Sequence, residues 1–176
     1  MEIKDSGNRR EFESGAVRDV AEGKGRCDLL PLGLICNIYL NKSPHLGRGM
    51  VLGHVQNYMD TGDTNCLEDA IECFLLNDSK WEGNWSTLFL EVAKHYEEGA
   101  KKYAERNWEK GINLHCYIDS GVRHYLKWLR GDTDEPHDRA FVWNMLGAIW
   151  THVNMPHLID LPFAKEDRAD DGWREN

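Results

Sequence analysis

The sequence lacks any run approaching the roughly 20 consecutive apolar residues that a membrane-spanning helix needs. Its beginning, MEIKDSGNRREFE, also lacks the apolar stretch of a secretory signal. No C-x-x-C pair occurs among the five cysteines, and five is an odd number. These absences argue against a disulfide framework and a zinc site, and they favour reduced thiols. We therefore expect a cytoplasmic protein without a membrane partner.

Positive charge is also scarce. The chain has 21 lysines and arginines against 30 aspartates and glutamates, which gives a formal net charge of −9. This balance argues against duplex nucleic acid as a partner, because binding it requires a basic surface that neutralises phosphates. It does not argue against a small nucleotide bound through a divalent metal ion, since such ions prefer carboxylate ligands. The seven tryptophans and six tyrosines supply core mass and can stack on a base.

The alternation of apolar and polar residues that marks a strand is absent as well, whereas helical spacing recurs. With 176 residues, 41% of them hydrophobic, the chain suits one globular domain. The pattern predicts helices over residues 29–39, 50–59, 65–76, 86–103, 115–129 and 138–153. We expect an all-α bundle of five or six helices. Residues 1–13 are expected to be loose, residues 14–160 to form the single helical domain, and residues 161–176 to form a charged tail.

Several of the scarce basic residues stand in a glycine-rich lead-in to the first predicted helix. Residues 14–28 read SGAVRDVAEGKGRCD, where three glycines are interleaved with Arg18, Lys24 and Arg26. Glycines allow the backbone to approach a ligand closely, and successive N–H groups can form an anion-binding nest. The segment is therefore either a phosphate-binding loop or an ordinary surface loop that leads into a helix.

The predicted helix 86–103 places Glu91, His95 and Glu98 on one face, at positions i, i+4 and i+7. Two carboxylates and an imidazole on one face can bind a divalent cation, with further ligands from a facing helix. The same spacing also occurs in solvated acidic stripes, and Glu97 can take the inward position of Glu98, because the pattern does not fix the rotation of the helix to one residue.

The predicted helix 115–129 contains an acid among apolar residues. Asp119 falls on the side expected to face the core, where a carboxylate costs several kcal/mol unless it is paired. It can bond Arg123 or His124, or it can bind a metal ion, and both alternatives stay open.

Two polar residues mark the last predicted helix. His137 stands at its start, where the helix dipole lowers the pKa of an imidazole. Asn144 lies two turns further on in a very apolar segment, and a buried Asn needs hydrogen-bond partners. Those partners are either a neighbouring helix or Asp119, or else a ligand or a metal-bound water.

Between two predicted helices lies the segment GAKKYAERNWEKG, residues 99–111. Its basic residues are Lys101, Lys102, Arg106 and Lys110. They are interleaved with Tyr103, Asn107 and Trp108, a mixture typical of a nucleotide pocket, where rings stack on the base and cations bind the phosphates. The alternative is an ordinary charged helix end, which the helix dipole also favours.

Four blocks of the sequence together resemble a known family. They read G-x-x-R-D-x-x-x-G-K-x-R-x-D-L-L-P, G-A-K-K-Y-x-x-x-N-W-x-K-G, D-x-x-x-R-H and P-H-x-x-x-x-x-x-N. In their order they are similar to the phage-associated dATP/dGTP diphosphohydrolase N-terminal family, which resembles the all-α MazG-like nucleotide pyrophosphohydrolases. The likeness covers residues 14–36 and 86–152, and residues 40–85 resemble an insertion relative to shorter members.

The resemblance implies hydrolysis of dATP and dGTP to the monophosphate and pyrophosphate, with Mg²⁺ or Mn²⁺ as cofactor. Carboxylates would hold the metal ions, and cations would offset charge on the leaving pyrophosphate. The resemblance also implies a homodimer or homotetramer in the cytosol of a phage-infected bacterium.

The site residues are predicted on this combined basis. The catalytic residues are Glu91, Glu98 and Asp119, and the metal ligands are these three together with His95. The predicted nucleotide-binding residues are Arg18, Lys24, Arg26, Lys102, Tyr103, Arg106, Asn107, Trp108, Lys110, Arg123, His124, His137 and Asn144.

The acids depart from the MazG-like pattern, which has E-x-x-E on one helix and E-x-x-D on another. The helix 86–103 carries E-x-x-x-H-x-x-E instead, and the helix after Pro136 has no E-x-x-D. Many relatives carry a second His at the position of Ala140. The metal site is then either incomplete or built from Asp119 and Asp138. The alternative functions are a non-hydrolysing protein that sequesters a nucleotide or a nucleotide immune signal, and a structural protein.

Overall fold

The computed structural model describes residues 7–19, 46–78, 80–81 and 84–163 of the chain. This part contains five α-helices and one two-stranded sheet, so the predicted all-α bundle is confirmed, with a small hairpin added to it. The helices are α2 Leu46–Thr61, α3 Asn65–Asn77, α4 Trp85–Tyr103, α5 Leu114–Arg130 and α6 His137–Asn154. Two 3₁₀ helices, η2 Asn107–Lys110 and η3 Pro156–Leu158, follow α4 and α6. The helix predicted over residues 29–39 lies outside the described residues.

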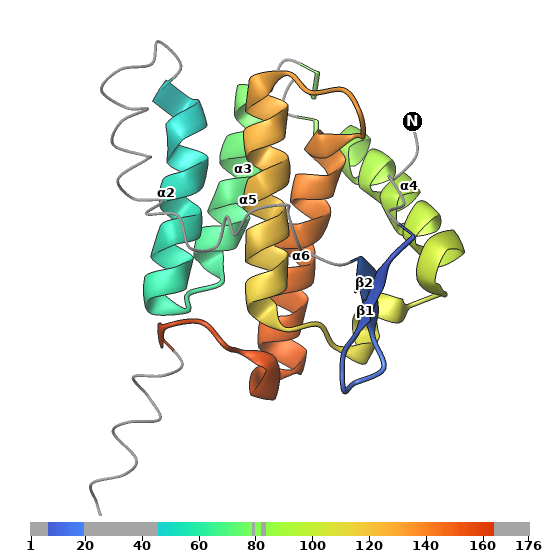
Figure 1. The fold of residues 1–176 in the computed structure, drawn as a ribbon. Helices are drawn as coiled ribbons and strands as arrows, with labels where there is room; N and C mark the ends of the chain where they lie inside the picture. Colours follow the sequence, from blue (N-terminus) through green and yellow to red (C-terminus); the bar gives the residue numbers. More distant parts are fainter. Residues whose placement is uncertain (1–6, 20–45, 79, 82–83, 164–176) are drawn as a thin grey trace, which may run out of the picture.

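Four of the helices run side by side, and the remaining one crosses them at a slant (Figure 1). Helix α2 packs along α3, α5 packs along α6, and α3 touches α6, so these four form the bundle. Helix α4 packs against α6 from the other side. None of the described helices combines the length and the apolar content needed to cross a membrane.

Local signals explain where the helices begin and end. The side chain of Asn84 accepts a hydrogen bond from the Thr87 amide and caps α4, so the helix begins one residue before the predicted limit of 86. Gly131 ends α5 in the left-handed conformation, with φ 84°, and its amide bonds carbonyls of the last turn. Pro156 follows α6 and begins η3, as expected of a residue that cannot continue a helix.

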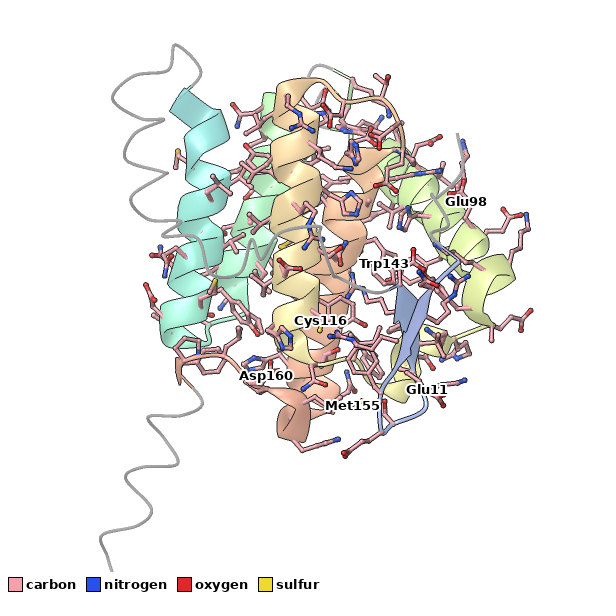
Figure 2. All side chains as sticks on the ribbon, viewed as in Figure 1. Glu11, Glu98, Cys116, Trp143, Met155 and Asp160 are labelled. Carbon is pink, nitrogen blue, oxygen red and sulfur yellow. The ribbon has the colours of Figure 1, made fainter. Side chains whose placement is uncertain are left out.

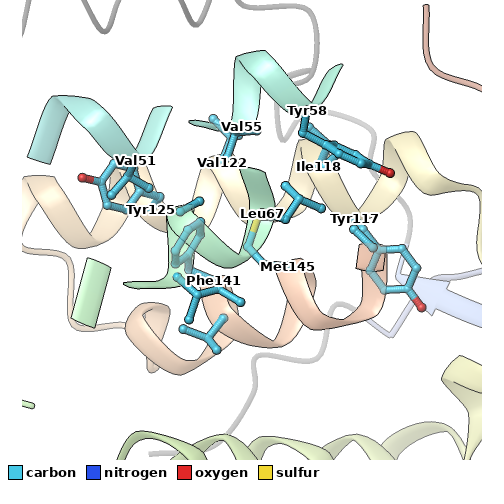
Figure 3. Packing of buried hydrophobic residues seen from close by; sticks show 14 of the residues in the cluster. Val51, Val55, Tyr58, Leu67, Tyr117, Ile118, Val122, Tyr125, Phe141 and Met145 are labelled. Carbon is cyan, nitrogen blue, oxygen red and sulfur yellow. The ribbon is translucent and has the colours of Figure 1, made fainter. Parts of the chain in front are cut away.

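The core lies between the four bundled helices (Figure 3). Tyr58 of α2, Leu67 of α3, Val122 of α5, and Phe141 and Met145 of α6 are among its buried side chains. Burial of such apolar side chains drives the packing of helices in water.

Helices α5 and α6 approach each other so closely that two glycines have no room for a side chain. A Cβ atom at Gly147 would overlap the ring of Tyr117, and one at Gly121 would overlap the end of Met145. This contact brings the polar residues of the two helices together on the side that faces α4 and the hairpin.

The hairpin corrects the sequence-based expectation that strands are absent. Strands β1 Arg9–Glu11 and β2 Val17–Asp19 pair antiparallel, with Arg10 opposite Arg18. Gly15 takes a positive φ of 77° in the turn between them. Strands of three residues are too short to display alternation, which is why residues 9–11 read as loose and residues 17–19 as part of a loop.

Candidate functional site

A cavity of about 1050 Å³ lies where the hairpin meets α4, η2, α5 and α6. Eleven of the predicted site residues line it, namely Arg18, His95, Lys102, Tyr103, Arg106, Asn107, Trp108, Asp119, Arg123, His124 and Asn144. Glu91, Glu98, Lys110 and His137 do not line it. Lys24 and Arg26 lie outside the described residues. Figure 2 shows Trp143 and Cys116 on the side of the bundle that faces the hairpin, with Glu98 above them on α4.

Asn107 holds the hairpin against η2. Its side chain accepts a 3.1 Å hydrogen bond from the Val17 amide and donates a 2.9 Å bond to the Val17 carbonyl. Ser14 adds a bond of 2.5 Å from its hydroxyl to the Gly111 carbonyl. Both ends of the Asn107 amide are therefore engaged by β2, and the geometry gives this residue a positioning role where the sequence predicted ligand binding.

Asp19, at the end of β2, gathers three side chains. Its carboxylate accepts bonds of 2.9 Å from Lys102, 3.0 Å from the Tyr103 hydroxyl and 3.0 Å from Arg9. Burial, with the Asp19 carboxylate beside it, raises the pKa of Tyr103 well above its usual value, so this hydroxyl stays protonated. Lys102 and Tyr103 thus line the cavity while fastening α4 to the hairpin.

Arg18 lines the cavity from strand β2 of the hairpin. Its Nη2 donates a 2.6 Å hydrogen bond to Oδ1 of Asn144, and its guanidinium lies 5.2 Å from the Tyr117 ring centroid and 5.7 Å from that of Trp143. Its Nη1 is buried and has no hydrogen-bond partner among the described residues. Asn144 donates its other bond, of 2.7 Å, to the Ala140 carbonyl, so its partners are Arg18 and its own helix. Arg18 is therefore a half-buried cation whose hydrogen-bonding partner Asn144 is neutral.

Aromatic rings form one wall of the cavity. Trp108 packs edge-on against Tyr96 and Trp150, with ring centroids 5.6 and 4.9 Å apart. Tyr96 also contacts Trp143 at 6.0 Å, so the wall runs from η2 to α6. Arg106, next to Trp108 in sequence, is largely exposed and pairs with Glu109. Trp108 and Trp143 are therefore placed to contact an aromatic base.

The predicted catalytic carboxylates do not converge on one point. Glu98 accepts a 2.6 Å hydrogen bond from Arg139, whose other terminal nitrogen lies 4.0 Å from Glu91. Asp119 pairs instead with Arg123, one turn along α5. The predicted cluster is thus replaced by two separate ion pairs.

Arg139 is the residue that the sequence-based reasoning missed at this point. Its side chain is 6% exposed, and it occupies the space beside α4 that a metal ion was expected to fill. The sequence did contain a signal for this pairing. Arg139 is the single arginine of the very apolar helix α6, and a buried arginine needs an acidic partner.

Of the four predicted metal ligands, His95 and Asp119 line the cavity, and Asp119 is paired with Arg123. His95 is buried, its ring lies 5.6 Å from that of Trp143, and its Nδ1 has no hydrogen-bond partner among the described residues. Burial and the nearby Arg139 lower its pKa to about 3, so the imidazole is neutral at physiological pH. A neutral ring of this kind accepts a hydrogen bond or binds a metal ion, but it holds a proton poorly.

A second group of ionisable residues lies where α5 ends and α6 begins. The Nδ1 atoms of His124 and His137 are 2.9 Å apart, and Glu135 Oε1 lies 3.8 and 3.7 Å from them. The Nε2 atom of His137 contacts Asp134 Oδ1 at 2.8 Å. Burial, with His137 beside it, lowers the pKa of His124 well below its usual value. The sequence predicted the two histidines as nucleotide-binding residues, whereas Asp134 and Glu135 were assigned only to a hydrophilic turn.

A third group surrounds Cys116, near the start of α5. His115 Nε2 lies 3.3 Å from the sulfur, Nδ1 of the same ring contacts Asp160, and Arg10 donates a 2.7 Å bond to the sulfur. The bonds to Asp160 and to Cys116 raise the pKa of His115 to about 10. Burial opposes ionisation of Cys116, but His115 and nearby Arg18 outweigh it and lower the pKa of the thiol. Only the adjacent His and Cys could have pointed to this group from the sequence, because Asp160 belongs to the segment after α6.

The fold and the cavity define a helical protein whose pocket beside the hairpin is lined by aromatic, basic and acidic side chains. The model of the family described as dATP/dGTP diphosphohydrolase, N-terminal, matches residues 79–160, which supports the predicted resemblance. The matched segment carries α4, α5 and α6 and every described cavity residue outside the hairpin. No curated protein and no solved structure matches the chain.

Proposed function

We propose that the protein hydrolyses purine deoxynucleoside triphosphates, dATP and dGTP, to the monophosphate and pyrophosphate. The family match supports the diphosphohydrolase class. The observation that carries the proposal is Arg18, because its guanidinium lines the cavity, its Nη1 is buried without a described partner, and its bonded neighbour is the neutral Asn144. A phosphate oxygen would satisfy both the charge and the remaining N–H groups.

The cavity also suits the rest of a nucleotide. Its volume of about 1050 Å³ is at the upper end of small-molecule sites. Trp108 and Trp143 offer ring faces and edges for the base, while Lys102 and Arg123 stand on the phosphate side, already oriented by Asp19 and Asp119. Binding would thus place the base and the phosphates against different elements.

The reaction itself is the attack of water on the α-phosphorus, which breaks the bond to the bridging oxygen and releases pyrophosphate. Arg18 would offset the charge that develops on the leaving group. His95 would orient the water by accepting a hydrogen bond at Nδ1, and the proton that the water loses would pass to solvent, because a pKa of about 3 leaves His95 unable to keep it.

A divalent ion, Mg²⁺ or Mn²⁺, belongs to the proposal, and when bound it would neutralise phosphate charge. The four predicted ligands do not fit one ion as they stand. Glu91 and Glu98 face Arg139, Asp119 faces Arg123, and only His95 presents a buried ring nitrogen without a described partner. The ion must therefore be held by other residues.

A second function is favoured by the same observation. Because the predicted carboxylates are paired with basic side chains, the second candidate is a nucleotide-binding protein that sequesters its ligand without cleaving it. One experiment separates the two functions. The protein is incubated with each deoxynucleoside triphosphate and Mn²⁺, and the products are resolved by chromatography. Release of pyrophosphate and dAMP or dGMP supports hydrolysis. Tight binding, with intact nucleotide recovered on heating, supports sequestration. If the protein neither cleaves nor binds any nucleotide, both functions are overturned.

The expected homodimer or homotetramer, and a cytosolic setting in a phage-infected bacterium, remain part of this proposal. Helix α4 exposes apolar side chains that suit contact with another copy of the chain. Leu90 is 69% exposed, and the rings of Phe89 and Trp85 stand 5.6 Å apart on the same helix. Light scattering of the purified protein would measure the mass of the assembly directly.

A further inference from the structure

The ionisable group between α5 and α6 has the geometry of a metal centre. His124 comes from α5, His137 begins α6, and Glu135 comes from the turn that joins them. The separations between the two Nδ1 atoms and Glu135 Oε1 are 2.9, 3.8 and 3.7 Å. A triangle with these sides has a circumradius of about 2.0 Å, so one point lies at metal–ligand bonding distance from all three atoms.

The surroundings of His137 orient it as a ligand. Its side chain is fully buried, and Asp134 Oδ1 lies 2.8 Å from its Nε2. A carboxylate at Nε2 holds the ring proton there and leaves the lone pair on Nδ1, which is the atom that faces His124 and Glu135. The same arrangement of carboxylate, histidine and ion recurs in metal sites, where the carboxylate fixes the ring and its tautomer.

The alternative grouping around His137 is weaker. Asp132 and Asp134 lie close enough to His137 to hold an ion with it. Asp132 is, however, paired with Arg130 at the protein surface. Lys127 lies near both groups, 3.5 Å from Asp134 and 3.8 Å from Glu135, but the side chain of Asp134 is 33% exposed, against 13% for Glu135. The set of two histidines and Glu135 is therefore the one with its ligand atoms turned inward.

The chemical types of the three ligand atoms indicate which ions the site can bind. Two imidazole nitrogens and one carboxylate oxygen suit Mn²⁺, Co²⁺ or Zn²⁺, whereas Mg²⁺ prefers oxygen ligands alone. Three protein ligands also leave positions for water or for an oxygen of a bound molecule. His124 and Glu135 line the same cavity as Arg18, so an ion here belongs to the pocket in which the nucleotide is proposed to bind.

We propose that His124, Glu135 and His137 bind one divalent transition-metal ion. This inference deepens the proposed function by naming the residues that hold its metal ion, and it rests on that function only for the role of the ion in hydrolysis. Binding of the ion itself requires no nucleotide, so the two proposals can fail separately.

The test uses the full chain after removal of metal with a chelator. Titration with Co²⁺, followed by visible absorption, and with Zn²⁺, followed by calorimetry, should show one ion per chain. The variants His137→Gln and Glu135→Gln should each raise the dissociation constant at least about tenfold, and Asp134→Asn about 10–100-fold, the range found for residues that orient a ligand. Mg²⁺ should not displace Co²⁺ at equal concentration.

His54→Gln is the matched control, because His54 also lies beside a carboxylate, 3.7 Å from Asp69, but on α2. It should bind Co²⁺ as the wild type does. Circular dichroism establishes whether each variant folds. If His137→Gln does not fold, Glu135→Gln provides the test. Absence of a bound ion, or equal affinity in His54→Gln and Glu135→Gln, would overturn the metal centre. Ion binding without cleavage of any nucleotide would leave the centre standing and remove the proposed hydrolysis.

Discussion

The guanidinium of Arg18 donates a 2.6 Å hydrogen bond to the side-chain oxygen of Asn144, across 126 residues of sequence. This contact joins β2 to the middle of α6 and places a cation above the aromatic residues Tyr117 and Trp143. The hairpin is therefore part of the cavity wall, although the family match begins only at residue 79. The contact also links Arg18, from the glycine-rich segment 14–28, to Asn144, the buried polar residue of the apolar helix α6.

Removing Glu98 should destabilise the fold, because Glu98 is the hydrogen-bonded partner of the buried Arg139. We expect Glu98→Gln to lower the free energy of unfolding by about 1–3 kcal/mol, the cost of weakening a buried charged hydrogen bond. Urea unfolding measures this. Glu97→Gln is the control, since Glu97 pairs with Lys101 at the surface and should leave stability unchanged. If Glu98→Gln unfolded like the wild type but lost affinity for Mn²⁺, the sequence-based assignment of Glu98 as a metal ligand would be right.

A methyl group at Gly147 should force α5 and α6 apart. Its Cβ would overlap the Tyr117 ring, which is fully buried and cannot move aside easily. We expect Gly147→Ala to lower the free energy of unfolding by about 1–3 kcal/mol through overpacking. Gly99→Ala on α4 meets nothing within 4 Å and should instead raise stability, by up to about 1 kcal/mol, because alanine favours helix. Thermal unfolding that ranks the two variants in the opposite order would contradict the close approach.

Cys116 should be the most reactive of the described thiols near neutral pH. His115 and nearby cations lower the pKa of its thiol, whereas burial raises the pKa of Cys66 and Cys73. A lowered pKa means that more thiolate is present as pH falls below the ordinary range of a thiol. Labelling with iodoacetamide at pH 7, read by peptide mass spectrometry, should modify Cys116 before the other two.

Asp160→Asn supplies the control for this reactivity. Asp160 bonds His115 and raises its pKa, so the variant should weaken the charge on the ring and slow modification of Cys116. Because Cys116 lines the cavity, bound nucleotide should slow it as well. Faster labelling of Cys66 or Cys73 than of Cys116 would contradict this prediction and show that the burial of Cys116 outweighs its lowered pKa.

The helices could be predicted from the sequence because apolar residues that are buried recur at helical spacing. Leu67 and Phe74, or Val122 and Tyr125, recur at helical spacing, and the predicted limits of their helices fall within two residues of the observed ones at most ends. The hairpin carried no such signal, since its strands have three residues each and depend on Asn107 and Asp19 for their attachment.

The candidate site was predictable in its residue types but not in its pairings. His124 and His137 could be recognised in the sequence as candidate site residues. Their contact, however, depends on how closely α5 packs on α6, and the spacing of residues within a single helix does not predict that distance. The sequence left open whether Asp119 bonds Arg123 or His124 or binds a metal ion, and in the structure it forms an ion pair with Arg123. Glu98 appeared to be an exposed or metal-binding acid because its partner, Arg139, lies 41 residues away.

The most direct test of the account is the affinity of a non-hydrolysable dATP analogue, measured by calorimetry in the presence of Mn²⁺. The wild type should bind it, and Arg18→Gln should raise the dissociation constant at least about tenfold, since a charge-assisted hydrogen bond contributes roughly 1.5–3 kcal/mol. Lys110→Gln, whose side chain does not line the cavity, should bind as the wild type does. Equal affinities for the wild type and Arg18→Gln, or no binding by either, would contradict the claim that the hairpin and the helices form a nucleotide site.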